Sequence, residues 1–196
     1  MVLNDMQLEQ AVENGLIKRE KDSILWSHED GVRTLEELKA NSQIQPASID
    51  VTLGDTFKRP FSLDVVKMDS EIEYRSITPV DKKILLSPRS FILGTTREVV
   101  DLPDDLTAFV EGRSSIGRMG LFIQNAGWVD PGFRGQITLE IFNASDFTIE
   151  LEVGRRIAQL VFVKMSNSCK FPYQGKYQYQ TGATESRIHL DSEVQK

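Results

Sequence analysis

The sequence is poor in the residues that usually bind structural metal ions. Its 196 residues include one cysteine, Cys169, and two histidines, His28 and His189. A lone cysteine excludes a disulfide within the chain, which fits a reducing compartment. Structural zinc usually takes four cysteine or histidine ligands, so we expect no zinc site. These three side chains are interpreted as ordinary surface or buried residues.

The sequence also lacks long apolar runs and an excess of basic residues. No run approaches the roughly 20 residues of a membrane helix. Met1–Met6 shows no basic segment followed by an apolar one, so we expect no secretory signal and a cytoplasmic protein. The formal net charge is −6, from 23 basic and 29 acidic residues. This charge disfavours broad nucleic-acid binding, which needs a basic face, but it leaves room for a small phosphate pocket.

Two short helices are predicted in the N-terminal part of the chain. Apolar residues near helical spacing predict a helix over 4–15, which Asn4 or Asp5 can cap. Thr34 begins a capping-box pattern, which predicts a shorter helix over 34–40.

Beyond about residue 44 the chain is predicted to be mainly β. Short β-branched runs alternate with turn signals and no helical periods lie between them, which indicates an antiparallel sandwich, jelly roll or barrel. The length suits one domain with a sizeable core, and no linker divides the chain. The predicted strands cover 49–53, 83–86, 91–95, 106–110, 136–142 and 157–163.

The segment from Lys170 onward has few aliphatic residues. It is rich in Gln, Tyr, Gly, Lys and Ser, so it cannot bury itself in a core of its own. Two interpretations stay open: the segment is disordered, or it folds over another part of the protein.

The stretch Gly112–Arg118, with the sequence GRSSIGR, contains residues that suit an anionic ligand. Glycines allow a close approach of the backbone, and guanidinium groups and hydroxyls can bind phosphate oxygens. The stretch is therefore a candidate phosphate cradle. The alternative is a polar turn with exposed arginines, since short Gly/Ser/Arg clusters are common in turns.

Glu140 is a lone carboxylate within the apolar run 137–142. Under strand alternation Thr138 and Glu140 share one face, and the apolar residues between and beside them share the other. A partly buried carboxylate beside a hydroxyl can have its pKa raised enough to transfer protons near neutral pH. The alternative is a glutamate that simply points to solvent.

Segments along nearly the whole chain resemble, in order, the dCTP deaminase family, which is itself related to the trimeric dUTPases. The segments are Pro46–Gly54 (PASIDVTLG), Gly112–Arg118, Ala126–Gly132 (AGWVDPG), Thr138–Glu140 with Gln159, and the tail residues Pro172, Tyr173, Lys176, Tyr177 and Gln180. Taken by itself, Pro46–Gly54 is interpreted as the start of a buried strand and a tight turn, so Asp50 within it is not assigned a catalytic role.

The resemblance implies a dUTPase-like β-clip or distorted jelly roll with short N-terminal helices. Three such subunits would form a homotrimer whose active sites are shared between chains. Residues 1–196 would form a single dCTP deaminase-like domain, with a flexible segment from about residue 170 that closes over the site.

The resemblance also implies a metal-free hydrolytic deamination of dCTP. Glu140 would be the catalytic acid and base, and Ser114 and Arg118 would position the attacking water and stabilise the developing charge. Asp130 would contact the deoxyribose or a second, hydrolytic water. The implied substrate-binding residues are Arg113, Ser115, Ile116, Gly117, Asp130, Thr138, Leu139, Gln159, Tyr173, Lys176 and Gln180.

The implied chemistry needs no zinc. Zinc deaminases carry a His-x-Glu motif and a Pro-Cys-x-x-Cys motif, and this sequence has neither. A carboxylate must then take the proton of the water. Magnesium is expected to enter with the triphosphate, because it usually binds through substrate phosphates and water. dTTP is a candidate inhibitor of the same site.

The pair Gly127-Trp128 departs from part of the family. Single-activity dCTP deaminases carry a His-Arg pair there, whereas the Gly-aromatic form resembles the bifunctional enzymes that also cleave dUTP to dUMP and diphosphate. We therefore expect dUMP as the product. The alternatives are a monofunctional deaminase that releases dUTP, a plain dUTPase and a non-catalytic nucleotide-binding protein.

Overall fold

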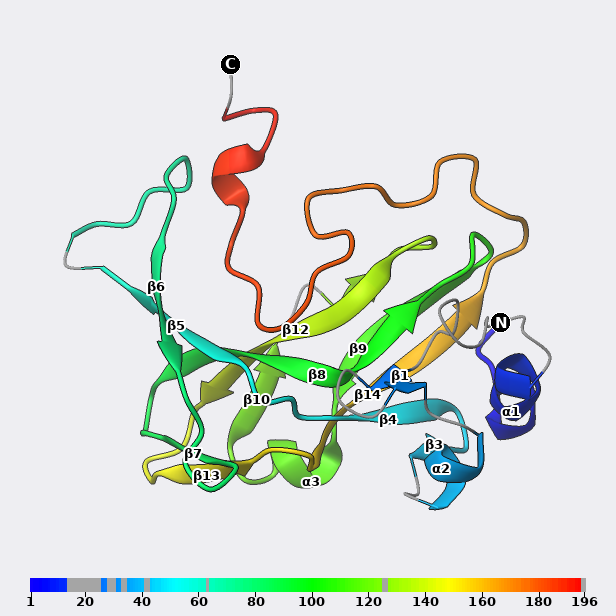
Figure 1. Cartoon of the computed structure of the whole chain (residues 1–196), viewed down its shortest axis with the longest axis horizontal. Coiled ribbons are helices and arrows are strands. Elements are labelled where there is room, and N and C mark those ends of the chain that lie inside the picture. Colours follow the sequence, from blue (N-terminus) through cyan, green and yellow to red (C-terminus); the bar gives the residue numbers. More distant parts are fainter. Residues whose placement is uncertain are drawn as a thin grey trace.

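Figure 1 shows a molecule dominated by β strands, with a few short helices. The computed structural model describes residues 1–13, 26–27, 31–32, 35–40, 43–62, 64–124 and 127–194. In these residues the helices are α1 (Asp5–Glu13), α2 (Leu35–Ala40), the one-turn α3 (Ser114–Gly117) and the 3-10 turn η2 (Ile188–Leu190). The predicted mainly β fold with short N-terminal helices is confirmed. None of the described helices is long and apolar enough to cross a membrane.

The strands form two large antiparallel sheets and one small one. In the seven-stranded sheet the order is β10-β12-β8-β1-β2, and β5 and β6 join through β8. The five-stranded sheet has the order β11-β9-β14-β4-β3, and β13 pairs with β7. The strands are β1 (Trp26–Ser27), β2 (Gly31–Val32), β3 (Ile44–Gln45), β4 (Ser48–Thr52), β5 (Phe57–Phe61), β6 (Glu73–Ile77), β7 (Lys83–Leu86), β8 (Phe91–Asp101), β9 (Leu106–Gly112), β10 (Leu121–Gln124), β11 (Trp128–Val129), β12 (Arg134–Asn143), β13 (Ile149–Glu152) and β14 (Arg156–Lys164).

One hydrophobic cluster joins the two large sheets. It contains the fully buried Val51 and Leu160 of the five-stranded sheet and the fully buried Ile92 and Leu139 of the seven-stranded sheet. Burial of one such side chain contributes roughly 1.5–3 kcal/mol. The apolar residues therefore fix which face of each strand meets the core, and they leave the other face to polar residues.

All six predicted strands are confirmed, as β4, β7, β8, β9, β12 and β14. The sequence does not predict the β5-β6 pair, whose segments FKRPF and EYRSI are largely polar and include a proline. These two strands keep most of their polar side chains exposed or half-buried. Hydrophobic alternation, the main sequence signal of a strand, is therefore absent from them.

The predicted N-terminal helix is confirmed as α1, and its cap is reciprocal. Gln7 N donates to Asn4 Oδ1 at 2.9 Å, and Asn4 N donates to Gln7 Oε1 at 3.1 Å. Two backbone N–H groups at the start of the helix are satisfied in this way. The second predicted helix is confirmed as α2, but its predicted cap, Thr34, lies outside the described residues.

Residues 170–194 run back over β12 (Figure 1). Gln136 N donates to Gln180 O at 3.0 Å, and Gln180 Nε2 donates to Gln136 O at 2.8 Å. A Cβ atom on Gly135 would lie 2.9 Å from Gln180 O, so only glycine lets the two segments approach so closely. Of the two interpretations of the tail, the structure therefore supports the one in which it folds over another part of the protein.

Asn143 fixes the end of β12 to β7 and to the turn that follows. It is fully buried. Its Nδ2 donates to the carbonyl oxygens of Leu86, Ser87 and Phe147 at 3.0, 3.1 and 2.8 Å. Its Oδ1 accepts from Ser145 N at 3.0 Å and from Ser145 Oγ at 2.7 Å.

Replacing Asn143 by alanine is expected to lower the free energy of unfolding by about 2–4 kcal/mol, because several buried backbone groups lose their partner. Chemical denaturation followed by circular dichroism measures the loss. Asn4→Ala removes an exposed helix cap and is the control, with an expected loss of about 1 kcal/mol. Equal losses in the two variants would mean that the buried network adds no stability beyond a surface cap.

Candidate active site

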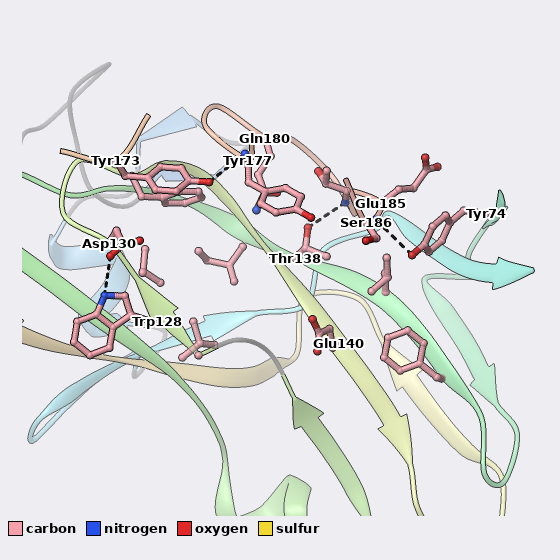
Figure 2. A pocket seen from close by; sticks show the side chains of 18 residues that line it. Tyr74, Trp128, Asp130, Thr138, Glu140, Tyr173, Tyr177, Gln180, Glu185 and Ser186 are labelled. Carbon is pink, nitrogen blue, oxygen red and sulfur yellow. Dashed lines mark hydrogen bonds between the residues drawn. The ribbon is translucent and has the colours of Figure 1, made fainter. Parts of the chain in front are cut away.

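A cavity of about 380 Å³ opens between β12, the loop that precedes it and the tail. Its size falls in the range of small-molecule sites. Figure 2 shows polar side chains from β12 and the tail together with aromatic and aliphatic ones. The lining residues include Thr138 and Glu140 from β12, Gly127, Trp128, Asp130 and Phe133 from the loop region, Tyr173, Tyr177, Gln180, Thr184, Glu185 and Ser186 from the tail, and Tyr74, Phe91 and Leu93 from β6 and β8.

Glu140 lies in the middle of β12 with its carboxylate toward this cavity (Figure 2). Its partner on β8 is Leu93, and directly opposite residues of an antiparallel pair share one face of the sheet. Thr138, two residues earlier on β12, shares that face. The Glu140 side chain is half-buried, and burial raises the pKa of its carboxyl above the ordinary value. The predicted polar face is confirmed, and the alternative of a glutamate that simply points to solvent is wrong.

The tail forms one wall of the cavity through its backbone. Thr184 N donates to Thr138 Oγ1 at 3.0 Å, and Ser186 N donates to Tyr74 Oη at 3.4 Å. Burial raises the pKa of the Tyr74 hydroxyl, so this group stays neutral. The segment 184–186 is thus held over the same face of the sheet that carries Glu140.

An ion pair joins the tail to β5. Lys58 Nζ lies 2.6 Å from Glu185 Oε1, and the two side chains are 30% and 40% exposed. Pairs that water can reach contribute up to about 1 kcal/mol. This contact therefore orients the tail without locking it.

The loop before β12 is shaped by a glycine and an exposed tryptophan. Gly127 has a φ of +68°, which favours glycine, and its carbonyl accepts from Val110 N at 2.8 Å. Trp128 packs edge to face on Phe109, with ring centroids 4.7 Å apart. Trp128 Nε1 donates to Asp130 Oδ1 at 2.9 Å and so orients the Asp130 carboxylate (Figure 2).

The stretch Gly112–Arg118, the second motif of the family resemblance, lies on a different part of the subunit. Arg113 Nε lies 3.1 Å from Oδ2 of Asp50, which is 2% exposed. Ser114 and Arg118 are exposed. In the described part of the chain, no residue of 112–118 lines the Glu140 cavity, and Figure 1 shows α3 at the bottom and the tail at the top. A single chain therefore does not bring Ser114 and Arg118 to Glu140.

Some of the other predicted substrate-binding residues line the Glu140 cavity, and some do not. Asp130, Thr138, Tyr173 and Gln180 line the Glu140 cavity. Lys176 belongs to the tail, where its ammonium group pairs with the Asp191 carboxylate.

Three more of the predicted residues do not line the Glu140 cavity. Leu139 is fully buried on the opposite face of β12, as alternation along the strand requires, so its side chain does not reach this cavity. Gln159 Nε2 donates to Gly112 O at 3.3 Å beside the second motif. Ile116 packs against the hydrophobic core.

The sequence does not predict the roles of Tyr74, Tyr177 and residues 184–186 in the cavity wall. Tyr74 comes from β6, a strand without hydrophobic alternation, although it is the one aromatic residue in that strand. The tail has no repeating pattern that would give its register against β12. Only the folded chain brings these residues to Glu140.

Comparisons with known proteins agree with the motifs and the fold. Residues 19–165 match the family model described as dCTP deaminase-like. The chain belongs to this family. It is 44% identical to the dUMP-forming dCTP deaminase of Persephonella marina over 197 residues, which covers 98% of this chain and 100% of that protein. It is 40% identical to the dUMP-forming dCTP deaminase of Aquifex aeolicus over 194 residues, 99% of this chain and 98% of that protein.

A solved structure of the dCTP deaminase family has a similar fold. The crystal structure of 2'-deoxycytidine 5'-triphosphate deaminase from Agrobacterium tumefaciens superposes with a TM-score of 0.57 at 22% sequence identity. The match covers 82% of this chain and 47% of that chain. The predicted fold and the predicted family are therefore confirmed.

The described residues of this dCTP deaminase-like chain offer no metal cage. Among the residues that the structure describes, no group of three or more His, Cys, Asp or Glu side chains lies close enough to hold a metal ion. The acidic residues that line the Glu140 cavity are Asp130, Glu140 and Glu185, and they come from three different segments.

Deleting residues 171–196 should lower the pKa of Glu140 toward its ordinary value, because the tail contributes to the burial that raises it. In the full chain Glu140 should therefore keep its proton to a higher pH than in the shortened chain. Carbon-13 NMR of Glu-labelled protein measures both midpoints, and Glu140→Gln identifies the resonance. An unchanged midpoint in a shortened chain that circular dichroism shows to be folded would mean that the sheet alone buries Glu140.

Proposed function

We propose that this family member is an enzyme that deaminates dCTP and cleaves the resulting dUTP to dUMP and diphosphate. The observation that carries the proposal is Glu140, half-buried in a cavity of small-ligand size with its pKa raised by burial. Such a carboxyl can accept and return a proton near neutral pH. The relatives from Persephonella marina and Aquifex aeolicus, both named dUMP-forming dCTP deaminases, support this choice of substrate and product.

Glu140 serves as base and then as acid in the deamination. Water attacks C4 of the cytosine ring while the Glu140 carboxylate takes one of its protons. The carboxyl returns the proton to N3. Glu140 then moves the proton of the added hydroxyl group to the amino group, the C4–N bond breaks, ammonia leaves and C4 becomes a carbonyl. The balance is dCTP plus water to dUTP plus ammonia. General acid–base catalysis of this kind contributes roughly 100- to 10,000-fold in rate.

The walls beside Glu140 suit a planar base. Leu93 and Phe91 come from β8, and Tyr177 comes from the tail. Apolar and aromatic walls with a few polar groups are typical of small-molecule sites. The same walls reduce the exposure of Glu140 to water, and this burial raises its pKa.

Ser114 and Arg118 act from a neighbouring subunit. Both are exposed, and the one-turn α3 lies outside the Glu140 cavity of its own chain. A homotrimer brings α3 of one subunit to Glu140 of the next and repeats the contact three times in a closed ring. The Ser114 hydroxyl and the Arg118 guanidinium then orient the water and stabilise the charge that develops on attack.

The triphosphate lies between the second motif and the tail. Magnesium enters with it, because this ion usually binds through substrate phosphates and water. When bound, the ion neutralises phosphate oxygens. The residues proposed for nucleotide binding, besides Thr138 and the backbone of Leu139, are Arg113, Ser115, Ile116, Gly117, Gln159, Tyr173, Lys176 and Gln180.

The segment from about residue 170 is proposed to be a flexible flap. It covers Glu140 through the bonds from Thr184 to Thr138 and from Ser186 to Tyr74. The flap must open for a nucleotide to enter, and closure then shields the reaction from bulk water.

Asp130 and Trp128 serve the second step, in which dUTP loses diphosphate. The hydrogen bond from Trp128 Nε1 holds the Asp130 carboxylate toward the cavity. Asp130 either contacts the deoxyribose or orients the water that attacks the α-phosphate, with diphosphate as the leaving group. dTTP has the same sugar and triphosphate, so it is proposed to inhibit by occupying this site.

Incubation of the full chain with dCTP and magnesium should give dUMP, ammonia and diphosphate, with little free dUTP at early times. Glu140→Gln keeps the size of the side chain but removes the proton acceptor, so deamination should fall by at least about 100-fold while nucleotide binding survives. Chromatography of the products and calorimetric binding measure the two effects. Accumulation of stoichiometric dUTP would indicate a monofunctional deaminase, and near-normal turnover by Glu140→Gln would remove Glu140 from the mechanism.

Light scattering should give about three times the chain mass of 22.2 kDa. Glu140→Gln and Arg118→Ala chains should each be nearly inactive alone, and co-refolded mixtures should recover part of the activity, because some sites then combine an intact Glu140 with an intact Arg118. Mixing Glu140→Gln chains with Glu140→Gln chains that also carry Arg118→Ala is the control, since no site then has Glu140. An active monomer, or no recovery in mixed trimers, would contradict shared sites.

A further inference from the structure

A second cavity, of about 490 Å³, is lined by four arginines. Arg97 comes from β8, Arg113 follows β9, Arg155 comes from the turn between β13 and β14, and Arg156 begins β14. Among the described residues that line this arginine cavity, Glu152 is the one acidic side chain. Three segments that are distant in sequence therefore bring positive charge to one place.

The fold holds three of these guanidinium groups in position. Arg113 Nη1 donates to Arg156 O at 3.2 Å. Arg113 Nε and Arg156 Nη1 lie 3.1 and 3.3 Å from the same oxygen, Asp50 Oδ2. Arg97 Nη1 lies 3.7 Å from where a Cβ atom on Gly154 would be, so the guanidinium packs against the turn. Positioned side chains lose less conformational entropy when they bind a ligand.

The acidic groups near the arginine cavity lie mostly beneath it. Asp50 is 2% exposed and Glu98 is 0% exposed. Glu98 accepts from Thr52 N and Thr52 Oγ1 at 2.8 Å and from Gln43 Nε2 at 2.9 Å, so its carboxylate is turned into the protein. Burial raises the pKa of Asp50 and of Glu98, although the charges and hydrogen bonds around them act the other way.

Counted over the described residues, more basic than acidic side chains lie at the arginine cavity. Four guanidinium groups face or border it, against Asp50, Glu98 and Glu152. Arg155 pairs with Glu152 at 3.5 Å on the exposed side, where the two side chains are 70% and 49% exposed and water screens the pair. An anion in the cavity meets more positive than negative charge.

We propose that the arginine cavity binds a phosphate-bearing anion. Guanidinium groups bind phosphate oxygens through paired N–H donors, and arginines from several segments can surround one anion. Two sources share this chemistry: free inorganic diphosphate, and the terminal phosphates of a nucleotide bound through Arg113. The second source rests on the proposed function, and the first does not.

The test titrates inorganic diphosphate, with magnesium, into the full chain by isothermal calorimetry. Arg97→Gln should weaken binding by at least about 10-fold, because it removes a charge-assisted hydrogen bond. Arg155→Gln should weaken it by about threefold, since Arg155 is more exposed. Arg59→Gln, an exposed arginine of β5 that does not line the cavity, is the matched control and should bind as the unchanged chain does.

A second titration distinguishes the two sources. dCTP is titrated into Glu140→Gln chains with and without Arg97→Gln. Weakening of dCTP and diphosphate together identifies the terminal phosphates of the nucleotide as the ligand, and weakening of diphosphate alone identifies a separate inorganic site. Diphosphate binding that is equal in the unchanged chain, Arg97→Gln and Arg155→Gln would overturn the proposal.

An assembly contact is the competing use of these arginines. If Arg97→Gln changes the mass measured by light scattering but leaves diphosphate binding unchanged, the arginine cavity meets an acidic surface of a second copy, and the proposal is wrong. Turnover of dCTP by the unchanged chain is measured separately. If the unchanged chain deaminates dCTP but the diphosphate titration fails, the proposal for the arginine cavity is wrong and the proposed function is unaffected.

Discussion

The antiparallel pairing of β12 with β8 is the interaction on which both cavities depend. It places Glu140 beside Leu93 in a half-buried position, and this burial raises the pKa of its carboxyl. The register shifts between Gln136 and Thr138, which is a bulge with its extra residues on β8. Ile137 N donates to Thr96 Oγ1 at 3.0 Å, so the irregular backbone keeps a partner. The bulged segment continues into Arg97, which lines the arginine cavity.

The two cavities differ in the charges that surround their buried carboxyl groups, Glu140 in the first and Asp50 beside the second. At Glu140 burial is the cause of the raised pKa. At Asp50, two arginines act against the same burial, and the carboxylate in turn fixes the position of Arg113. The first arrangement suits proton transfer, whereas the second suits the binding of an anion.

Much of this arrangement can be predicted from local sequence patterns. Alternation along 136–142 places Thr138 and Glu140 on a polar face, and the structure has them there. For the run Gly112–Arg118 the sequence leaves two interpretations open, a phosphate cradle and a polar turn with exposed arginines. The structure shows Ser114 and Arg118 exposed and Arg113 in an ion pair with Asp50. The contacts of the tail could not be predicted, because they follow from backbone hydrogen bonds to β12 and not from a hydrophobic pattern.

The sequence by itself determined the mainly β fold, the family and the identity of the carboxylate at the centre of the Glu140 cavity. The strands and the face that carries Glu140 follow from residue type and spacing within single segments. The family follows from several motifs in order along the chain. Only the tertiary structure decided that Tyr74 and Glu185 join that cavity, that Gly112–Arg118 does not, and that Arg97 and Arg113 line one second cavity. These outcomes depend on strand register and on the docking of the tail, which bring together residues far apart in the chain. The sequence pattern of a single segment does not predict such contacts.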